Sequence, residues 1–119
     1  MGLDQWLYKI TPKGEELVIE WRKANQIHAY FDRLCDGVEN LERYEVGLGD
    51  LENLRDTCQK VLDNRELAEK ELPVMMGCFF GSYSYDEWYF DEVEYTVNEL
   101  NKVLDNSSDD DEFCYQAWW

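Results

Sequence analysis

The sequence predicts an α+β fold, in which a four- to five-stranded mixed or antiparallel sheet is packed on one face by three main helices. Short apolar or β-branched runs alternate along the chain with longer segments of helical period. The chain has 119 residues, the usual length of one domain, and 45% of them are hydrophobic, which is enough for one core. We therefore expect one domain over residues 1–119, with a flexible acidic connector at 106–112, an aromatic C-terminal strand at 113–119, and chain ends that lie near each other.

Five segments are predicted to be strands. They are residues 3–10, 17–19, 44–46, 74–80 and 113–119. The first two flank a turn signal, TPKG, at residues 11–14. The segment at 74–80 reads VMMGCFF, and a short run that is apolar throughout predicts a central strand buried on both faces. The last segment, FCYQAWW, is too aromatic to be a solvated tail.

Helical periodicity marks most of the remaining chain. The predicted helices span residues 21–34, 51–62 (with Asp50 as its cap), 65–72 and 86–105. The first helix is expected to bury a stripe of Ala24, Ile27, Phe31 and Leu34. The last helix has the clearest stripe, which consists of Phe90, Val93, Val97, Leu100 and Leu104.

The charge of the chain is strongly negative and unevenly distributed. The net charge is −16, from 27 acidic and 11 basic residues. Residues 71–119 carry a single basic residue, Lys102, against 12 acidic ones. Such a field repels nucleic acid and anionic membranes and attracts basic protein surfaces. The alternative is that the charge serves solubility alone.

The cysteines and the N-terminal sequence indicate a reducing compartment. Cys35, Cys58, Cys78 and Cys114 lie in different segments and show no CxxC spacing. The N-terminus lacks a basic stretch followed by a long apolar run, and no apolar segment approaches transmembrane length. We expect free thiols in a cytoplasmic protein that has no cofactor and no membrane contact.

Several motifs follow one another in a specific order and spacing. They are MGLD at residues 1–4, WRKAN at 21–25 followed by Ile27 and His28, FFGS at 79–82, YDE at 85–87, and an aromatic ending with Phe113, Tyr115 and Trp118. Together they resemble a family of small uncharacterised proteins of tailed bacteriophages and prophages. The resemblance implies a non-virion role in the cytoplasm of an infected bacterium, of the kind that blunts host defences or redirects host enzymes.

An acidic ladder is expected on the predicted helix at 86–105. Its carboxylates recur at steps of four and three, so they lie on one side of the helix. Regular carboxylates on a rigid element imitate a phosphate backbone and would bind Lys and Arg residues of a partner. The expected partner-binding residues are Glu87, Trp88, Asp91, Glu94, Asp109, Asp110, Asp111 and Glu112. The alternative is an ordinary solvated helix face.

A second candidate site collects polar and aromatic residues from two of the motifs. The residues expected to form this ligand cleft are Trp21, Arg22, Asn25, His28, Ser82 and Tyr85. Arg22 would contact an anion, so the cleft would sequester or cleave a nucleotide-like signal. The alternative for His28, the only histidine, is a half-buried residue bonded to a neighbour. Residue spacing supports neither a Cys₃His zinc site nor a Cys–His nucleophile.

The sequence therefore favours binding over catalysis. The expected function is that of a phage counter-defence protein, which inhibits or modulates a host or defence-system protein with a basic surface through a DNA-mimic-like face. Direct binding of nucleic acid is not expected. The nucleotide cleft is the first alternative, and a structural or assembly role is the second. Trp118 and Trp119 would either seal a homodimer or cap the sheet of their own chain.

Overall fold

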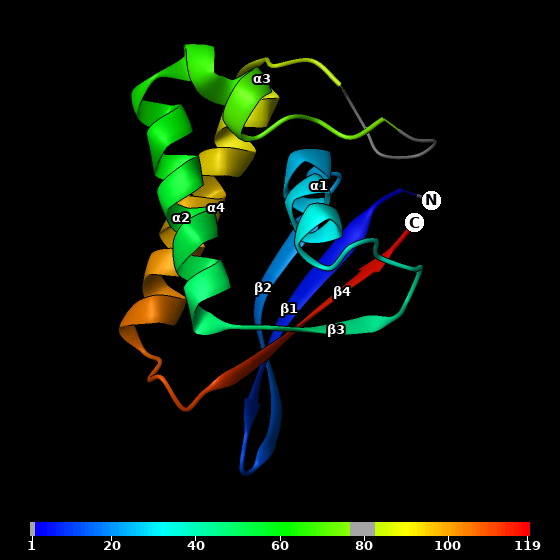
Figure 1. Cartoon of the computed structure of the whole chain (residues 1–119), viewed down its shortest axis with the longest axis vertical. Helices are drawn as coiled ribbons and strands as arrows, with labels where there is room; N and C mark the ends of the chain where they lie inside the picture. Colours follow the sequence, from blue (N-terminus) through cyan, green and yellow to red (C-terminus); the bar gives the residue numbers. More distant parts are fainter. Residues whose placement is uncertain (1, 77–82) are drawn as a thin grey trace.

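In the computed structural model, which describes residues 2–76 and 83–119, four strands form an antiparallel sheet in the order β2-β1-β4-β3 (Figure 1). The strands are β1 (Asp4–Thr11), β2 (Gly14–Arg22), β3 (Arg43–Val46) and β4 (Glu112–Trp118). The helices are α1 (Asn25–Leu34), α2 (Leu48–Asp63), a 3-10 turn η1 (Arg65–Leu67), α3 (Ala68–Glu71) and α4 (Glu87–Asp105). The predicted α+β class is confirmed, and the described residues form four strands.

The two central strands come from opposite ends of the chain. β1 pairs with β2 through a tight hairpin, and its other edge pairs with β4, so that Asp4 lies opposite both Arg22 and Trp118. β3 pairs with the outer edge of β4. The labelled chain ends consequently lie next to each other, at the same end of the two central strands, as expected (Figure 1).

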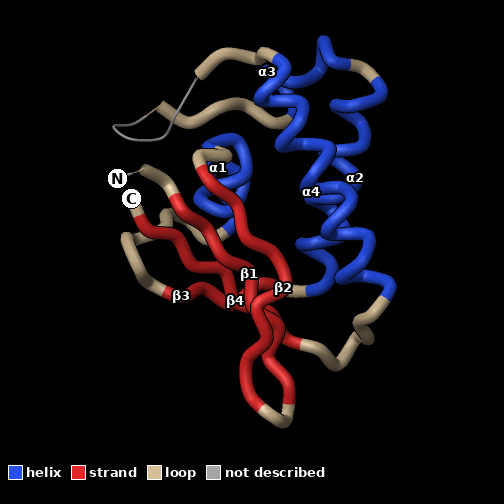
Figure 2. The backbone as a smooth tube through the Cα atoms, turned by 180° about the vertical axis from the view of Figure 1, so that it is seen from behind, coloured by secondary structure: helices blue, strands red, loops and turns tan. Residues whose placement is uncertain are grey.

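The helices pack on one side of the sheet. Side chains alternate along the strands, and the buried set includes Leu7, Ile19 and Tyr115. α1 lies against this inner side, while α2 and α4 pack against each other beside β2 (Figures 1 and 2). Phe31 of α1 stacks on Tyr115, with ring centroids 4.0 Å apart, and this contact joins the helix to the centre of the sheet.

The predicted central strand at 74–80 is wrong for its described part, since Val74–Met76 form no strand. The backbone N–H groups of this segment donate to side chains instead of to a neighbouring strand. The Val74 N–H donates to the Tyr85 hydroxyl (3.2 Å), and the Met75 N–H donates to Asn25 Oδ1 (3.2 Å). Residues 77–80 lie outside the described residues. The central positions of the sheet belong to β1 and β4.

The predicted start of the first helix is also wrong. Trp21 and Arg22 end β2, because pairing with β1 continues as far as the Asp4–Arg22 pair. Lys23 then turns the chain with a φ of +57°, and α1 begins at Asn25. Leu34, expected in the buried stripe, is 39% exposed in the last turn of α1.

A chain of buried hydrogen bonds connects α1 to the two central strands. The Gln5 side-chain amide donates to the Ala24 carbonyl (2.9 Å), and the Tyr115 hydroxyl donates to Gln5 Oε1 (2.7 Å). The hydroxyl has then used its proton, so it accepts from His28 Nδ1 at 2.9 Å. His28 therefore carries its proton on Nδ1, and the bonds leave the buried polar atoms of Gln5 and Tyr115 satisfied.

Tyr115→Phe should lower the free energy of unfolding by about 1–3 kcal/mol, because it leaves buried groups of Gln5 and His28 without their shared partner. Tyr8→Phe removes a hydroxyl from the other side of the same sheet and should cost less than about 0.5 kcal/mol. Urea unfolding of both variants measures the difference. Equal midpoints would show that the buried hydrogen bonds do not stabilise the fold.

Candidate functional site

The residues of the predicted ligand cleft do not surround one hollow. Trp21, Asn25 and His28 are each at most 1% exposed, and they are bonded within the core. Trp21 Nε1 donates to Thr96 Oγ1 (2.9 Å), which fastens β2 to α4. The Tyr85 hydroxyl accepts a hydrogen bond from the Val74 N–H, and Asn25 Oδ1 accepts one from the Met75 N–H, as described above. Arg22 is exposed, and Ser82 lies outside the described residues.

His28 is a buried structural residue. Burial lowers its pKa below the ordinary value, and the negative charge of Asp32 opposes that shift only in part. The ring of Trp119 packs edge-on against the imidazole, with centroids 5.0 Å apart. Asn40 holds the Trp119 backbone through two hydrogen bonds. Trp119 thus packs within its own chain, and the imidazole is neutral near pH 7.

A hollow of about 590 Å³ opens beside Arg22, between the end of β2 and the start of α4. It is lined by Arg22, Lys23, Gln26, Ser84, Asp86, Trp88, Tyr89 and Glu92. The Gln26 amide donates to the Tyr89 carbonyl (3.2 Å), so its floor is fixed by a bond between α1 and α4. Two cationic side chains line the hollow, and two carboxyl groups line it as well. Of the predicted cleft, the described lining contains Arg22 alone.

The acidic side of α4 faces solvent. Asp86 caps the N-terminus of the helix, and its Oδ1 accepts from the Tyr89 N–H at 3.2 Å. Glu87, Asp91 and Glu94 are all exposed. Trp88 beside them is 75% exposed. We call Glu87, Trp88, Asp91 and Glu94 the acidic α4 face.

One cation lies against the acidic α4 face. Arg65 pairs with Glu87 at 2.7 Å, and its guanidinium lies 4.3 Å from the centroid of the Phe90 ring. Arg65 comes from η1, and this ion pair ties the end of α2 to the beginning of α4. The pair is exposed to solvent on both sides, so it is worth little in free energy and leaves the field of the face negative.

The acidic run at residues 109–112 lies at the other end of α4. The helix has 19 residues and is roughly 28 Å long, so the run is separated from Trp88 by that length. Asp111 pairs with Lys9 at 3.3 Å, and Lys9 also donates to the Asn106 carbonyl (2.8 Å). These bonds have a structural role, because they join β1 to the turn that follows α4. The expected partner-binding residues therefore occupy two separate places.

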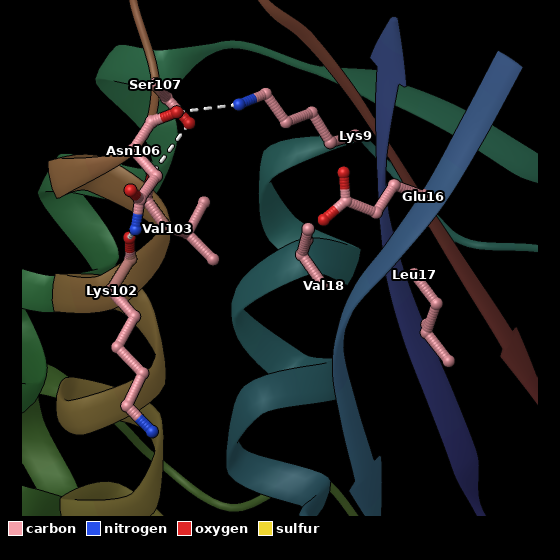
Figure 3. A pocket seen from close by; sticks show the side chains of 8 residues that line it. All are labelled: Lys9, Glu16, Leu17, Val18, Lys102, Val103, Asn106 and Ser107. Atoms are coloured by element: carbon pink, nitrogen blue, oxygen red, sulfur yellow. Dashed lines mark hydrogen bonds between the residues drawn. The ribbon is translucent and has the colours of Figure 1, made fainter. Parts of the chain in front are cut away.

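A smaller hollow, of about 250 Å³, lies next to this turn (Figure 3). The Lys9 side chain reaches across it to the backbone of Asn106, and Ser107 closes the helix by donating to the Val103 carbonyl (2.6 Å). The ammonium group is thus already bound within the chain. The described residues that line this hollow form no catalytic or ligand-binding group.

The cysteines that the structure describes are not arranged for catalysis. Burial raises the pKa of the Cys35 and Cys114 thiols, and it raises the pKa of Cys58 to about 12. Protonated thiols are poor nucleophiles and poor metal ligands. Within residues 2–76 and 83–119, no three His, Cys, Asp or Glu side chains converge to hold a metal ion. Cys78 lies outside this part of the chain.

The sequence did not reveal a surface on the second side of the sheet, which faces the viewer in Figure 2 and is crossed by none of the described helices. We call it the aromatic sheet face. It consists of Trp6, Tyr8, Ile10, Leu17, Cys114 and Trp118. Leu17 and Trp118 are 50% and 52% exposed. The sequence did contain one signal for this face: Trp6 and Tyr8 are at alternate positions of β1, so they lie on the same side of the sheet, opposite the buried side chains.

Comparison with known proteins yields no relative: no protein-family model, curated protein or solved structure matches this chain. Among the described helices, none has the length and the apolar composition needed to cross a membrane. The site must therefore be interpreted from its own geometry and charge.

The buried state of His28 predicts how stability depends on pH. Its pKa is lower in the folded chain, so the unfolded chain binds the proton more readily below about pH 6.5. The free energy of unfolding should therefore fall as the pH drops from about 7.5 to about 5.5. His28→Asn, which keeps an N–H donor near Nδ1 but does not titrate, should lose most of this dependence.

Urea unfolding across that pH range makes the measurement. Glu92 has a pKa raised by burial and acts in the opposite direction, but it is present in both proteins and cancels in the comparison. A pH dependence that is unchanged in His28→Asn would contradict the buried, neutral state of the imidazole.

Proposed function

We propose that this chain is a binding protein that inhibits or modulates a partner protein with a basic surface, through the acidic α4 face. The observation that carries the proposal is Trp88, a tryptophan that is 75% exposed and lies among the carboxylates of Glu87, Asp91 and Glu94. Tryptophan is the side chain most enriched at the energetic centres of interfaces. Carboxylates around it would pair with Lys and Arg of the partner, whose cationic groups also favour an indole ring.

The overall charge supports a charge-guided encounter. The chain carries 27 acidic residues, and seven of them form ion pairs within the part of the chain that the structure describes. The acidic residues of α4 repeat about once per turn, or roughly every 5.4 Å, on a rigid helix. Such a field speeds association with basic proteins and repels nucleic acid. Proteins that handle nucleic acid present basic surfaces, and the resemblance to phage proteins makes a bacterial host protein the expected partner.

Removing three charges from the acidic α4 face should weaken partner binding about tenfold, since each exposed pair is worth roughly 0.2–1 kcal/mol. The variant is Glu87→Gln, Asp91→Asn and Glu94→Gln. Its matched control, Glu39→Gln, Glu52→Gln and Glu69→Gln, removes the same charge from exposed positions outside α4. Affinity capture from bacterial extract, with retained proteins quantified by mass spectrometry, compares the two with the original chain.

Trp88→Ala should give a loss of similar size, and retention should fall steeply as ionic strength rises from about 0.05 M to about 0.3 M. Equal retention by both triple variants would place the contact elsewhere. Retention that does not respond to salt would refute the charge-driven mechanism itself.

A second function is favoured by the hollow beside Arg22. Its volume of about 590 Å³ falls within the usual range for small-molecule sites. Arg22 and Lys23 would bind an anionic group, and the indole of Trp88 would stack on an aromatic ring. A nucleotide-like ligand has both features. Asp86 and Glu92 line the same hollow and oppose an anion, so this function takes second place.

The double variant Arg22→Gln and Lys23→Gln distinguishes the two functions. It should weaken binding of adenosine monophosphate or a cyclic dinucleotide at least tenfold, because charge-assisted hydrogen bonds are worth about 1.5–3 kcal/mol. It should leave capture of a basic partner unchanged or stronger. The control is Lys13→Gln with Lys70→Gln, and quenching of Trp88 fluorescence, assigned with Trp88→Phe, is the measurement. No quenching by any nucleotide would end the second function.

A further inference from the structure

The aromatic sheet face already binds one guanidinium group. The Arg43 guanidinium lies 4.7 Å from the centroid of the Tyr8 ring, and the same guanidinium pairs with Glu15. A cation over an aromatic ring with a carboxylate at its side is a favourable arrangement at an exposed site. Arg43 comes from β3, Tyr8 from β1 and Glu15 from β2, so the ring, the acid and the cation meet across the sheet.

Two further positions of the face have a ring and an acid next to each other. Trp6 lies directly opposite Glu20, and its Nε1 donates to Glu20 Oε2 at 3.0 Å. Trp118 lies directly opposite Asp4, which pairs weakly with Arg22 at 3.9 Å. Residues opposite each other on neighbouring strands have their side chains on the same side of a sheet. The Trp6–Glu20 and Trp118–Asp4 pairs thus each have an aromatic ring beside a carboxylate, as Tyr8 and Glu15 do around Arg43.

The negative charge around the aromatic sheet face determines which kind of molecule can bind there. A second copy of the chain would carry the same net charge of −16, and its own Glu20 and Glu112 would meet those of the first copy. Nucleic acid would meet the same carboxylates. An arginine-bearing protein segment would instead find an acid for each guanidinium and a ring for its flat face.

We infer that the aromatic sheet face binds an extended, arginine-bearing segment of the protein partner, with guanidinium groups placed on Trp6 and Trp118. This inference rests on the proposed function, because it assumes a basic protein partner, and it adds a second contact surface with a preference for arginine over lysine. Arginine is preferred since its planar group stacks on rings and is less strongly hydrated than an ammonium. An extended segment suits the regular spacing of side chains across neighbouring strands.

The test uses a synthetic peptide of alternating arginine and serine, with a lysine–serine peptide of equal charge as its counterpart. Titration of the isotope-labelled chain, followed by NMR, reads the backbone amides and the tryptophan indole N–H signals. The arginine peptide should shift the indole signals of Trp6 and Trp118 and should bind several-fold more tightly than the lysine peptide. Trp118→Ala should weaken it about two- to fivefold, which is the size of an exposed cation–π contact.

Glu20→Gln should give a similar loss without removing a ring, and it guards against a misfolded tryptophan variant. Glu69→Gln, which removes a carboxylate from an exposed position away from the sheet and from α4, is the matched control and should change arginine-peptide binding less than twofold. A loss with Trp118→Ala but not with the charge-neutralised α4 variant supports this inference, and the acidic α4 face is tested separately by capture of the protein partner. The reverse result leaves the proposed function standing and overturns this inference.

Four other outcomes would also overturn it. They are no binding of the arginine peptide, equal binding of the lysine peptide, a dimer in solution whose interface protects the Trp118 indole, and a single-stranded oligonucleotide that shifts the same indole signals.

Discussion

The fold depends on the buried hydrogen bonds that run from His28 through Tyr115 and Gln5 to the carbonyl of Ala24. They join α1, β4 and β1, and the stacked rings of Phe31 and Tyr115 lie beside them. A buried polar group without a partner costs more than an ordinary hydrogen bond contributes, so this arrangement admits few alternatives. It places α1 on one side of the sheet and so determines which side no described helix covers.

The second determinant is the attachment of α4. Trp21 Nε1 bonds to Thr96, the Tyr95 hydroxyl donates to the Glu20 carbonyl (2.8 Å), and the Tyr89 hydroxyl donates to the Leu72 carbonyl (2.5 Å). These bonds hold the first half of the helix, over residues 89–96. Its carboxylates are thus fixed relative to the sheet, and a partner would meet charges already in position. Less side-chain and backbone freedom is then lost on binding, which favours affinity.

The sequence was a good guide wherever periodicity was long. It predicted α4, the strands at both ends of the chain, and the solvent exposure of Glu87, Asp91 and Glu94, because a stripe over many residues reports directly on burial. It was wrong where a local pattern had a different cause. Val74 and Met75 look like a buried strand, yet their backbone groups bond to Tyr85 and Asn25, whose positions are known only from the tertiary structure.

The same reason explains the errors at the candidate site. Helical spacing grouped Trp21 with Asn25 and His28, but Trp21 belongs to a strand whose length is determined by its partner β1. The aromatic sheet face was not predicted from the sequence, because its residues come from three strands. Which residues belong to it depends on the strand order and register. The hollow beside Arg22 likewise joins segments more than 50 residues apart. The alternating aromatic residues of β1 mark only one strand of the face, and no local pattern marks the hollow.

The position of β4 in the middle of the sheet has a consequence for biosynthesis. β1 is made first, but one of its edges remains without a neighbour until residues 112–118 leave the ribosome. β3, paired to the far side of β4, waits for the same segment. Pairing over so long a sequence separation is slow to form. The nascent chain therefore exposes an incomplete sheet edge until residues 112–118 have been made, and an unpaired strand edge of this kind is open to non-native pairing during that interval.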